Sequence, residues 1–318
     1  MDPVDVLRRL GGIATYQEIL GPCTRKQLRH AVAQGQVIHA RRDRYALVDT
    51  EATRLTAARA GGVLSHLSAA AWWGWKVKHP PLRTTVTIGP HGHRPGGEVD
   101  VRWSQLADAE VHRHVSRPVR TVLDCARALP FDEALAVADS ALRSGLVAPH
   151  ELQVAAATLP RTGRTRALRV VEAADARAAN PFESVVRAVA LDVPGLRVEP
   201  QGKVPGVGRV DLLDESLGLA VEADSFEHHG TLAGLRRDVR RYTELTRRGL
   251  TVIRFLWEEA MFDQTRVHAV LVDAVAHCAA VRAALGPLDL RDSRWTGHTG
   301  GSSRSEPWTS GEVPRWAG

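Results

Sequence analysis

Apolar positions change their spacing along the chain, and these changes divide the sequence into four regions. In the first region, residues 1–50, helical spacing predicts three short helices at 4–10, 14–20 and 25–34, each followed by glycine. Two alternating runs at 37–40 and 45–48 then predict a hairpin around a polar turn. Three helices followed by a basic hairpin are typical of a winged helix-turn-helix.

The second region, residues 51–178, predicts a mixed helical and β domain. A helix is expected from Ser65 to Gly74, strands at 85–88 and 98–102, and two or three Ala/Leu-rich helices between 120 and 157. We interpret the Ser65–His66 pair as helix capping and packing. A further helix is expected at 164–179.

The third region, residues 179–286, alternates helical and strand patterns and predicts an α/β core. The expected elements are helices at 181–189, 232–248 and 265–285 and strands at 196–201, 209–213, 217–223 and 250–255. Residues 287–318 are rich in Gly, Ser, Thr and Pro, so we expect a disordered tail. The fold class is therefore α+β and multidomain.

Composition adds an expected partner and compartment. The net charge of +6 and the pI near 9.7 favour an anionic partner, of which nucleic acid is the commonest. The chain's three cysteines are isolated and suit packing in a reducing cytoplasm. The sequence has no apolar run of membrane-spanning length and no secretory signal, so we expect a cytoplasmic protein without membrane contact.

Acidic residues gather on two neighbouring strands of the third region. Val210 and Leu212 alternate with Asp211, which we expect on the opposite face of its strand. Glu222 and Asp224 share one face of the next strand, and the turn between the strands brings Asp211 within reach of Glu222. The alternative is that these are solvated carboxylates at the surface of a sheet.

Glu183 adds a carboxylate near the positive end of its helix, so three or four carboxylates converge. Such clusters normally hold a cation, and all-oxygen ligands suit Mg²⁺ (or Mn²⁺), which activates a bound water for attack on phosphorus. His228 and His229 follow as candidates for a base or a phosphate contact. No organic cofactor is indicated.

The helix predicted at 232–248 carries many arginines, of which Arg237 and Arg241 are candidate DNA contacts. The alternative is a solvated helix face. The basic residues of the first region are a second candidate DNA surface, on the third helix and the hairpin: Arg25, Lys26, Arg29, Arg41, Arg42 and Arg44. A protein-interaction module is the alternative for this unit.

Six short motifs between about residues 179 and 260 occur in the order that is expected of a known protein family. They are Pro181–Ser184, Gly208–Asp211, Val221–Asp224, His228–His229, Arg237–Arg241 and Gly249–Phe255. This segment resembles the DUF559 family of the restriction-endonuclease-like superfamily, which is similar to very-short-patch repair endonucleases. The resemblance implies that Glu183, Asp211 and Glu222 are metal ligands and that Asp224 with His228 or His229 completes a catalytic centre.

The chain departs from that pattern at two positions. The family's usual glycine is Ser225, and Asp224 stands where the wider superfamily has a lysine. Residues 1–50 resemble the N-terminal domain of AbiEi-type antitoxins of type IV toxin–antitoxin systems, through the segments at 11–15, 24–28 and 44–47. Segments 65–70 and 117–124 are similar to what often follows in such proteins.

Two principal hypotheses follow. The first is a DNA-binding protein with a metal-dependent endonuclease domain that nicks or cleaves DNA in repair or phage defence. The second is a transcriptional repressor or antitoxin, with a cognate toxin as partner and an inactive nuclease fold. A protein-interaction module in phage defence is a third hypothesis.

Overall fold

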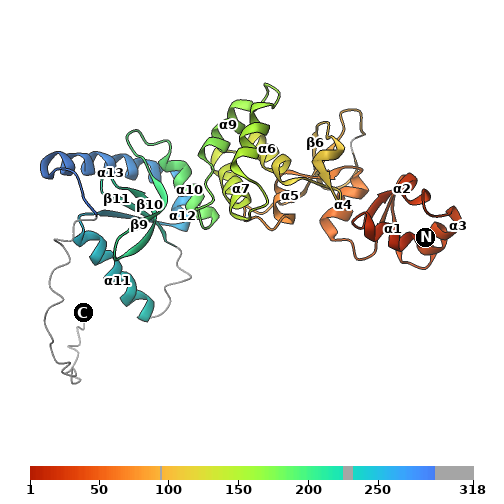
Figure 1. Cartoon of the computed structure of the whole chain (residues 1–318), viewed down its shortest axis with the longest axis horizontal. Coiled ribbons are helices and arrows are strands. Elements are labelled where there is room, and N and C mark those ends of the chain that lie inside the picture. The colour runs from red at the N-terminus through yellow and green to blue at the C-terminus, as the bar shows by residue number, and fades with distance from the viewer. Residues whose placement is uncertain (94, 225–231, 291–318) are drawn as a thin grey trace, which may run out of the picture.

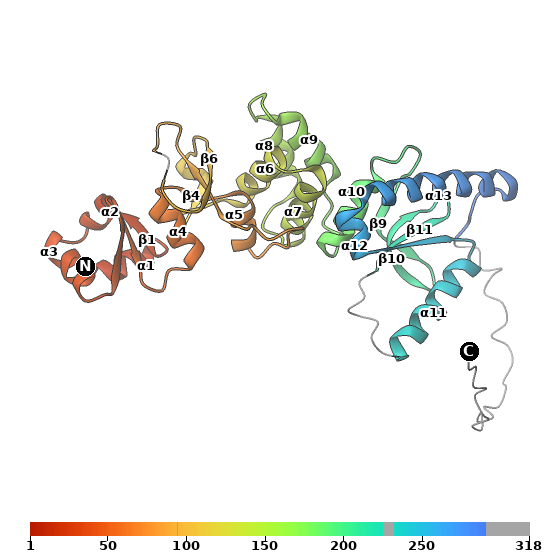
Figure 2. The same cartoon turned by 180° about the vertical axis from the view of Figure 1, so that it is seen from behind.

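The computed structural model describes residues 1–93, 95–224 and 232–290 and forms a mixed α+β structure with three sheets. Figures 1 and 2 show the units in a row, with the N-terminal unit at one end and the C-terminal sheet at the other. The predicted α+β class is confirmed at this level.

The N-terminal unit has three helices and an antiparallel sheet of order β1-β3-β2. Its elements are α1 (Pro3–Arg9), β1 (Ile13–Thr15), α2 (Tyr16–Leu20), α3 (Arg25–Ala33), β2 (Val37–Arg41) and β3 (Arg44–Leu47). Thr15 and Thr24 begin α2 and α3 through capping boxes with Glu18 and Gln27. Every element contributes to one core: Val6, Leu7, Ala14, Ile19, Leu28, Ala31, Val37 and Leu47.

Strand β1 occupies the place where the second helix was predicted to begin. Ile13 and Ala14 pair with Ala46 and Tyr45 of β3, and the helix starts only at Tyr16. The prediction was wrong here because pairing with a distant strand, which local spacing does not reveal, decides the conformation.

The middle region begins with a five-stranded mixed sheet of order β6-β5-β4-β8-β7. Its elements are α4 (Ala52–Ala60), β4 (Val63–Leu64), α5 (His66–Trp72), β5 (Thr84–Ile88), β6 (Val99–Trp103), a 3₁₀ turn (Asp108–Glu110), β7 (Val111–His112) and β8 (Val115–Ser116). The two predicted strands, β5 and β6, are present and pair in parallel. Ser65 is the N-cap residue of α5 but makes no side-chain capping bond, whereas Ser65 and His66 are both buried, as the packing part of that interpretation expected.

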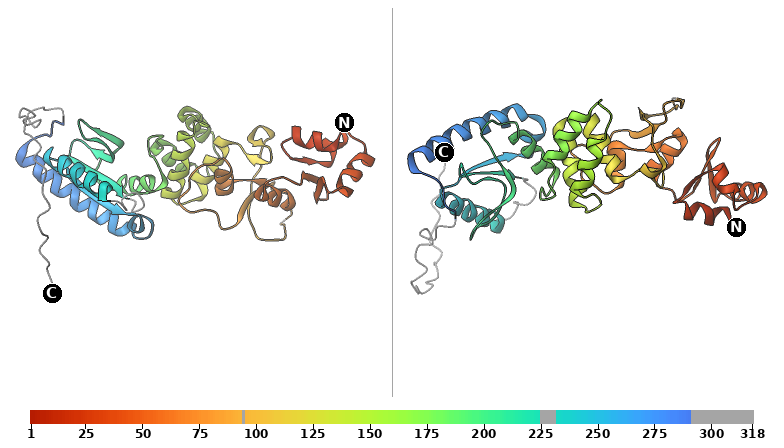
Figure 3. Two further views of the ribbon diagram at one scale, coloured as in Figure 1. Left: turned by 90° about the horizontal axis from the view of Figure 1, so that it is seen from below. Right: turned by 45° about the horizontal axis from the view of Figure 1, so that its top comes forward.

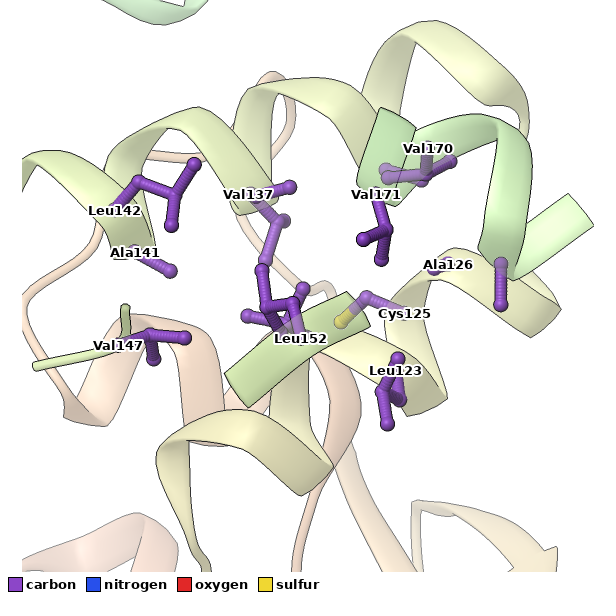
Figure 4. Close-up of a cluster of buried hydrophobic side chains, with 14 of the residues drawn as sticks. Leu123, Cys125, Ala126, Val137, Ala141, Leu142, Val147, Leu152, Val170 and Val171 are labelled. Atoms are coloured by element: carbon purple, nitrogen blue, oxygen red, sulfur yellow. The ribbon is translucent and has the colours of Figure 1, made fainter. Parts of the chain in front are cut away.

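A helical bundle completes the middle region. It consists of α6 (Pro118–Ala128), α7 (Phe131–Arg143), α8 (Pro149–Ala157) and α9 (Arg164–Ala173), which is shorter than the helix predicted at 164–179. Figure 4 shows how Leu123, Val137, Leu152 and Val170 from these four helices meet in one apolar cluster. Cys125 is buried there, and Cys23 and Cys278 are also buried free thiols.

The C-terminal unit is a four-stranded mixed sheet of order β12-β11-β10-β9 with helices on both faces (Figure 3). Its elements are α10 (Pro181–Ala190), β9 (Glu199–Val204), β10 (Gly208–Asp214), β11 (Leu219–Asp224), α11 (Leu232–Arg247), β12 (Thr251–Leu256), α12 (Trp257–Phe262) and α13 (Gln264–Leu285). Helices α10, α12 and α13 pack on one face, and α11 packs on the other. Strands β9, β10 and β11 are antiparallel neighbours, and β12 runs parallel to β11.

Among the described residues, only α13 is long and apolar enough to cross a membrane by length and composition. Val267, Leu271, Ala274 and Cys278 bury one side of it in the apolar cluster beneath α10 and the sheet. This spacing of three to four residues is that of a helix packed on a core.

The ordered chain extends beyond the predicted start of the tail at residue 287. Leu290 is buried, and Leu288 packs beside it, in the cluster that Leu245 and Leu250 form under α11. Residues 291–318, the rest of the predicted tail, lie outside the described residues.

A buried ion pair joins the helical bundle to the C-terminal unit. The Asp139 carboxylate on α7 accepts two bonds of 2.7 Å from Arg187 on α10, and the two side chains are 1% and 5% exposed. Asp139 also accepts from Ser184 Oγ at 2.7 Å and from the Asp175 N–H at 2.8 Å. Arg187 donates to the Ala173 carbonyl at 2.5 Å. With so many bonds, the pair fixes the position of α10 against α7.

Arg187→Met should lower the free energy of unfolding by about 3–5 kcal/mol, because it leaves the Asp139 carboxylate buried without its cation. Urea denaturation followed by circular dichroism measures this loss. Asp192→Asn is the control, since it breaks an exposed pair with Arg169 and should cost less than about 1 kcal/mol. A loss below about 1 kcal/mol for Arg187→Met would contradict the assigned role of the pair.

Candidate functional site

Glu183 lies at the third residue of α10 and links that helix to the sheet. Its Oε1 accepts from Asn180 Nδ2 at 2.8 Å, and Asn180 Oδ1 accepts from the Glu183 N–H at 3.0 Å. Its Oε2 accepts from the Ala179 N–H at 2.7 Å and from Gln201 Nε2 at 2.9 Å. Asn180 therefore caps the helix, and the Glu183 carboxylate joins the segment before the helix to strand β9.

Asp211 and Glu222 face each other across the hairpin of β10 and β11, as predicted. Leu212 pairs with Val221, so the next position of the ladder brings the two acids opposite one another. Their carboxyl groups are hydrogen-bonded to each other. Asp211 Oδ2 also accepts from the Ala223 N–H at 2.8 Å. Glu183, Asp211 and Glu222 are called the acidic cluster below.

Strand β10 loses its regular alternation at Asp211. Val210 packs in the apolar cluster under α11, whereas Leu212 packs in the cluster under α10 and α13. Residues two apart in a regular strand share a face, so the prediction that Val210 and Leu212 lie together was wrong. Alternation on β11 is regular, with Ala220 and Val221 in the two different clusters.

Gln201 is the residue of this site that the sequence reasoning missed. It lies on β9 opposite Asp211, between the pairs Val210–Gly202 and Leu212–Pro200. Its φ of +54° lies in the left-handed region, which costs a non-glycine residue on the order of 1–2 kcal/mol. Its amide nitrogen donates to Glu183 Oε2 and, at 3.2 Å, to Asp211 Oδ1. Nothing in the sequence distinguishes this glutamine from a surface residue.

Arg241 on α11 reaches the acidic cluster from the other face of the sheet. It donates to Glu222 Oε1 at 2.6 Å and to the Arg209 carbonyl at 2.5 Å. Arg237, one turn earlier, is exposed. Of these two predicted DNA contacts, Arg237 faces solvent, and Arg241 is engaged with an acid.

Burial shapes the protonation of the cluster. Desolvation, together with the Asp211 charge, raises the pKa of Glu222 to about 7, against the opposing effect of Arg241. Burial likewise raises the pKa of Glu183 to about 6, with Asp211 adding to the shift and the Ala179 N–H opposing it. The pKa of Asp211 is also raised, mainly by burial. Near neutral pH the cluster therefore holds a proton that separate carboxyl groups would have lost.

The remaining predicted centre residues do not join these three acids among the described residues. Asp224 is on the same face of β11 as Glu222, but its carboxylate forms an ion pair with Arg254 of β12. Arg254 also lies over the Tyr242 ring, 4.1 Å from its centroid. His228 and His229, and Ser225 with them, lie outside the described residues.

The donor set of the cluster fits a hard divalent cation, because Glu183, Asp211 and Glu222 offer only oxygen atoms. In the described part of the chain, no three His, Cys, Asp or Glu side chains are already gathered as metal ligands. The oxygens of Glu183, Asp211 and Glu222 bond instead to Gln201, Arg241 and backbone N–H groups. A cation would have to displace the proton that the cluster retains near neutral pH and compete with these donors.

Fewer of the predicted basic residues of the N-terminal unit are exposed than the sequence suggested. Arg25, Lys26 and Arg29 are exposed on α3, and Arg42 is exposed at the hairpin tip. The other two hairpin arginines turn toward the middle region because the hairpin packs against it. Arg41 donates to the Ala60 carbonyl at 2.7 Å, and Arg44 contacts His114.

Arg25 and Arg29 line an open groove with aromatic neighbours. Tyr16, His39 and Tyr45 line it together with Leu28 and Val32, and the rings of His39 and Tyr45 are stacked with their centroids 4.7 Å apart. The groove thus combines positive charge with flat apolar faces.

These features define a mixed α+β protein with a buried carboxylate cluster in its C-terminal sheet and an exposed basic helix in its N-terminal unit. No family model matches the chain. It is 30% identical over 216 residues to two proteins of Mycobacterium tuberculosis, "Uncharacterized protein Rv2248" (strain H37Rv) and "Uncharacterized protein MT2308" (strain CDC 1551). The matches cover 64% of this chain and 77% of each relative. The chain belongs to the family of Rv2248 and MT2308.

One solved structure, the crystal structure of RV2827C protein from Mycobacterium tuberculosis, shows a distant similarity. The sequence identity is 16% and the TM-score is 0.30, over 59% of this chain and 78% of that chain. Similarity at this level carries no inference about fold or function.

The stability of the metal-free protein relative to Glu222→Gln should fall as pH rises. The unfolded chain releases the Glu222 proton near pH 4.5, whereas the folded chain retains it to about pH 7. The protonated form therefore stabilises the fold below about pH 4.5, and this advantage is lost as pH rises through about 7. The free energy of unfolding of the wild type, measured relative to that of Glu222→Gln, should fall by on the order of 3 kcal/mol between about pH 4.5 and pH 8.

Urea denaturation in EDTA at a series of pH values measures this dependence. Glu215→Gln, an exposed turn residue of the same hairpin, should track the wild type throughout. A constant difference between wild type and Glu222→Gln would show that the folded protein does not retain the proton.

Proposed function

We propose that this protein binds DNA and nicks or cleaves it in a reaction that depends on Mg²⁺ or Mn²⁺. The observation that carries the proposal is the buried, hydrogen-bonded pair of Asp211 and Glu222, joined to Glu183 through Gln201. Buried acids with raised pKa values destabilise a fold and are typical of functional sites. The resemblance of about residues 179–260 to the DUF559 family supports a restriction-endonuclease-like core.

Glu183, Asp211 and Glu222 would hold the cation, and a bound cation would supply an activated water near neutral pH. Gln201 orients Glu183 and Asp211 through its two hydrogen bonds. The exposed arginines of α11 offer contacts for backbone phosphates beside the cluster. They are Arg236, Arg237, Arg240 and Arg247.

The N-terminal unit is, in this proposal, a winged helix that places the protein on DNA. Helix α3 exposes Arg25, Lys26 and Arg29, and Arg42 lies at the tip of the following hairpin. Such side chains contact phosphates and position the protein, and the helix reads bases in the major groove. Repair of DNA or defence against phage in the cytoplasm is the setting that these parts suit.

A second candidate function is transcriptional repression, as an antitoxin of a type IV toxin–antitoxin system with an inactive nuclease fold. Two ion pairs favour it, Asp224 with Arg254 and Glu222 with Arg241. In the first, an acid stands where the nuclease superfamily has a lysine. In the second, Arg241 is bonded to the Glu222 carboxylate, which the cation would need as a ligand. A cognate toxin encoded beside this protein would be the partner.

Asp211→Asn and Glu222→Gln should each reduce metal-dependent nicking of supercoiled plasmid by at least about 100-fold. The reason is that a cation contributes several kcal/mol to catalysis and these variants remove a ligand charge. The assay is a titration of Mn²⁺ and Mg²⁺ on plasmid, single-stranded and mismatched DNA. The same variants should lose the rise in melting temperature that Mn²⁺ gives the wild type.

Glu215→Gln serves as the matched control and should cleave like the wild type. Absence of both cleavage and a metal-dependent rise in melting temperature in the wild type would exclude the nuclease and favour the repressor.

The double variant Arg25→Glu/Arg29→Glu should weaken DNA binding by about 100-fold at moderate salt, since two phosphate contacts become repulsive. It should also make the plot of log affinity against log salt shallower by about 2. Fluorescence anisotropy on the protein's own promoter fragment measures both. The double variant Arg59→Glu/Arg83→Glu, which changes two exposed arginines of the middle region, is the control for net charge. Unchanged promoter binding by the double variant would place the DNA contact elsewhere.

A further inference from the structure

A polar cavity of about 220 Å³ lies in the middle region, away from both sites described above. It is bounded by the end of β6, one side of α6 and the turn before α9. Its lining residues are His66, Arg102, Trp103, Ser104, Asp124, Arg127, Ala128, Thr162 and Gly163. His66 and Asp124 come from the two sequence segments, 65–70 and 117–124, to which neither proposed activity gives a role.

Asp124 presents an unsatisfied acceptor at this cavity. The residue is 4% exposed, and its Oδ1 accepts from Arg120 Nε at 2.9 Å. Its Oδ2 is buried and has no hydrogen-bond partner. Leaving a buried acceptor unpaired costs about 1–3 kcal/mol, more when it is charged. A ligand with an N–H or O–H group would remove that cost.

His66 is held in a strained position on the same wall. Its φ is +51°, a left-handed conformation that costs a residue with a Cβ on the order of 1–2 kcal/mol. Strain of this kind gathers at ligand-binding positions. Burial, with the positive charges of Arg102, Arg120 and Arg127, lowers the pKa of His66 to about 3, so the ring is neutral.

Hydrogen bonds behind the ring hold it in place. Thr87 Oγ1 donates to Ser65 Oγ at 2.8 Å, and Ser65 Oγ lies 3.0 Å from His66 Nδ1. The position of the neutral ring at the cavity is therefore fixed by its neighbours.

The charges around the cavity favour an anion. Arg120 donates to Asp124, Glu110 and Ser104, so its guanidinium is already engaged by neighbouring side chains. Arg102 is exposed at the rim, and Arg127 donates to the Thr162 carbonyl while lining the cavity. Counting Arg102, Arg120 and Arg127 against Glu110 and Asp124 leaves an excess of one positive charge. Trp103, 47% exposed, adds a flat aromatic face.

We propose that this cavity binds a nucleoside monophosphate group, either of a free nucleotide or at the end of a DNA strand. Arg102 and Arg127 pair with the phosphate, and the base stacks on Trp103. An N–H or O–H group of the nucleoside donates to Asp124 Oδ2, in the manner of carboxylates that accept from base amino groups. The site binds and positions its ligand: the pKa of His66, about 3, is too low for the ring to hold a proton near neutral pH, and Ser65 is fully buried.

The test is isothermal titration of the full-length protein in EDTA with CMP, GMP and inorganic phosphate. One nucleotide should bind per chain, at least about tenfold more tightly than phosphate alone. Arg102→Gln and Asp124→Asn should each weaken nucleotide binding at least about tenfold. Arg83→Gln, which removes an exposed charge of the same region outside the cavity, should bind like the wild type. Circular dichroism checks that Asp124→Asn folds, and Arg102→Gln changes only an exposed side chain.

The source of the ligand follows from a second titration with short thymidine oligonucleotides. Binding that requires a 5′-phosphate and is weakened by Arg102→Gln identifies a DNA end, whereas binding of mononucleotides alone identifies a free nucleotide. The proposal is overturned if nucleotides bind no better than phosphate, or if Arg102→Gln and Arg83→Gln bind alike.

Discussion

The buried pair of Asp139 and Arg187 is the interaction on which the C-terminal unit most depends. Both side chains are desolvated, and the Asp139 carboxylate also accepts from Ser184 and the Asp175 backbone, so α10 has one favourable position against α7. That position determines where the amino end of α10 lies. Glu183, at this end, is thereby brought beside Gln201 and Asp211 on the sheet. A charge pair outside the acidic cluster therefore shapes that cluster.

Three features balance the acidic cluster. The pKa of Glu222 is raised to about 7 by burial and by the Asp211 charge, the Gln201 amide bridges Glu183 and Asp211, and Arg241 forms an ion pair with Glu222. A divalent cation would compete with the bound proton and with these donors for the carboxylate oxygens. Arg241 belongs to α11, whose other arginines face solvent, so the same helix serves the cluster and the proposed DNA surface. In the proposed function, cation binding and DNA binding would therefore be connected through α11.

The middle region differs in character from the two units beside it. Its bundle has an apolar core, yet α5 carries a strained histidine and α6 carries a carboxylate oxygen without a hydrogen-bond partner. A chain rarely retains strain and an unpaired polar atom beside one cavity unless the site is used. The middle region therefore has its own binding chemistry, in addition to its role as a link between the terminal units.

The sequence by itself determined most of the local elements and the central acid pair. Helical spacing around Leu28 and strand alternation around Val221 depend on near neighbours, and a short hairpin places Asp211 opposite Glu222 without help from the rest of the fold. Tertiary structure decided the rest. Strand β1, the left-handed Gln201, the pairing of Asp224 with Arg254 and the inward turn of Arg44 all depend on partners distant in sequence. Local patterns carry no record of such partners, because packing and desolvation set their energies only once the chain is folded.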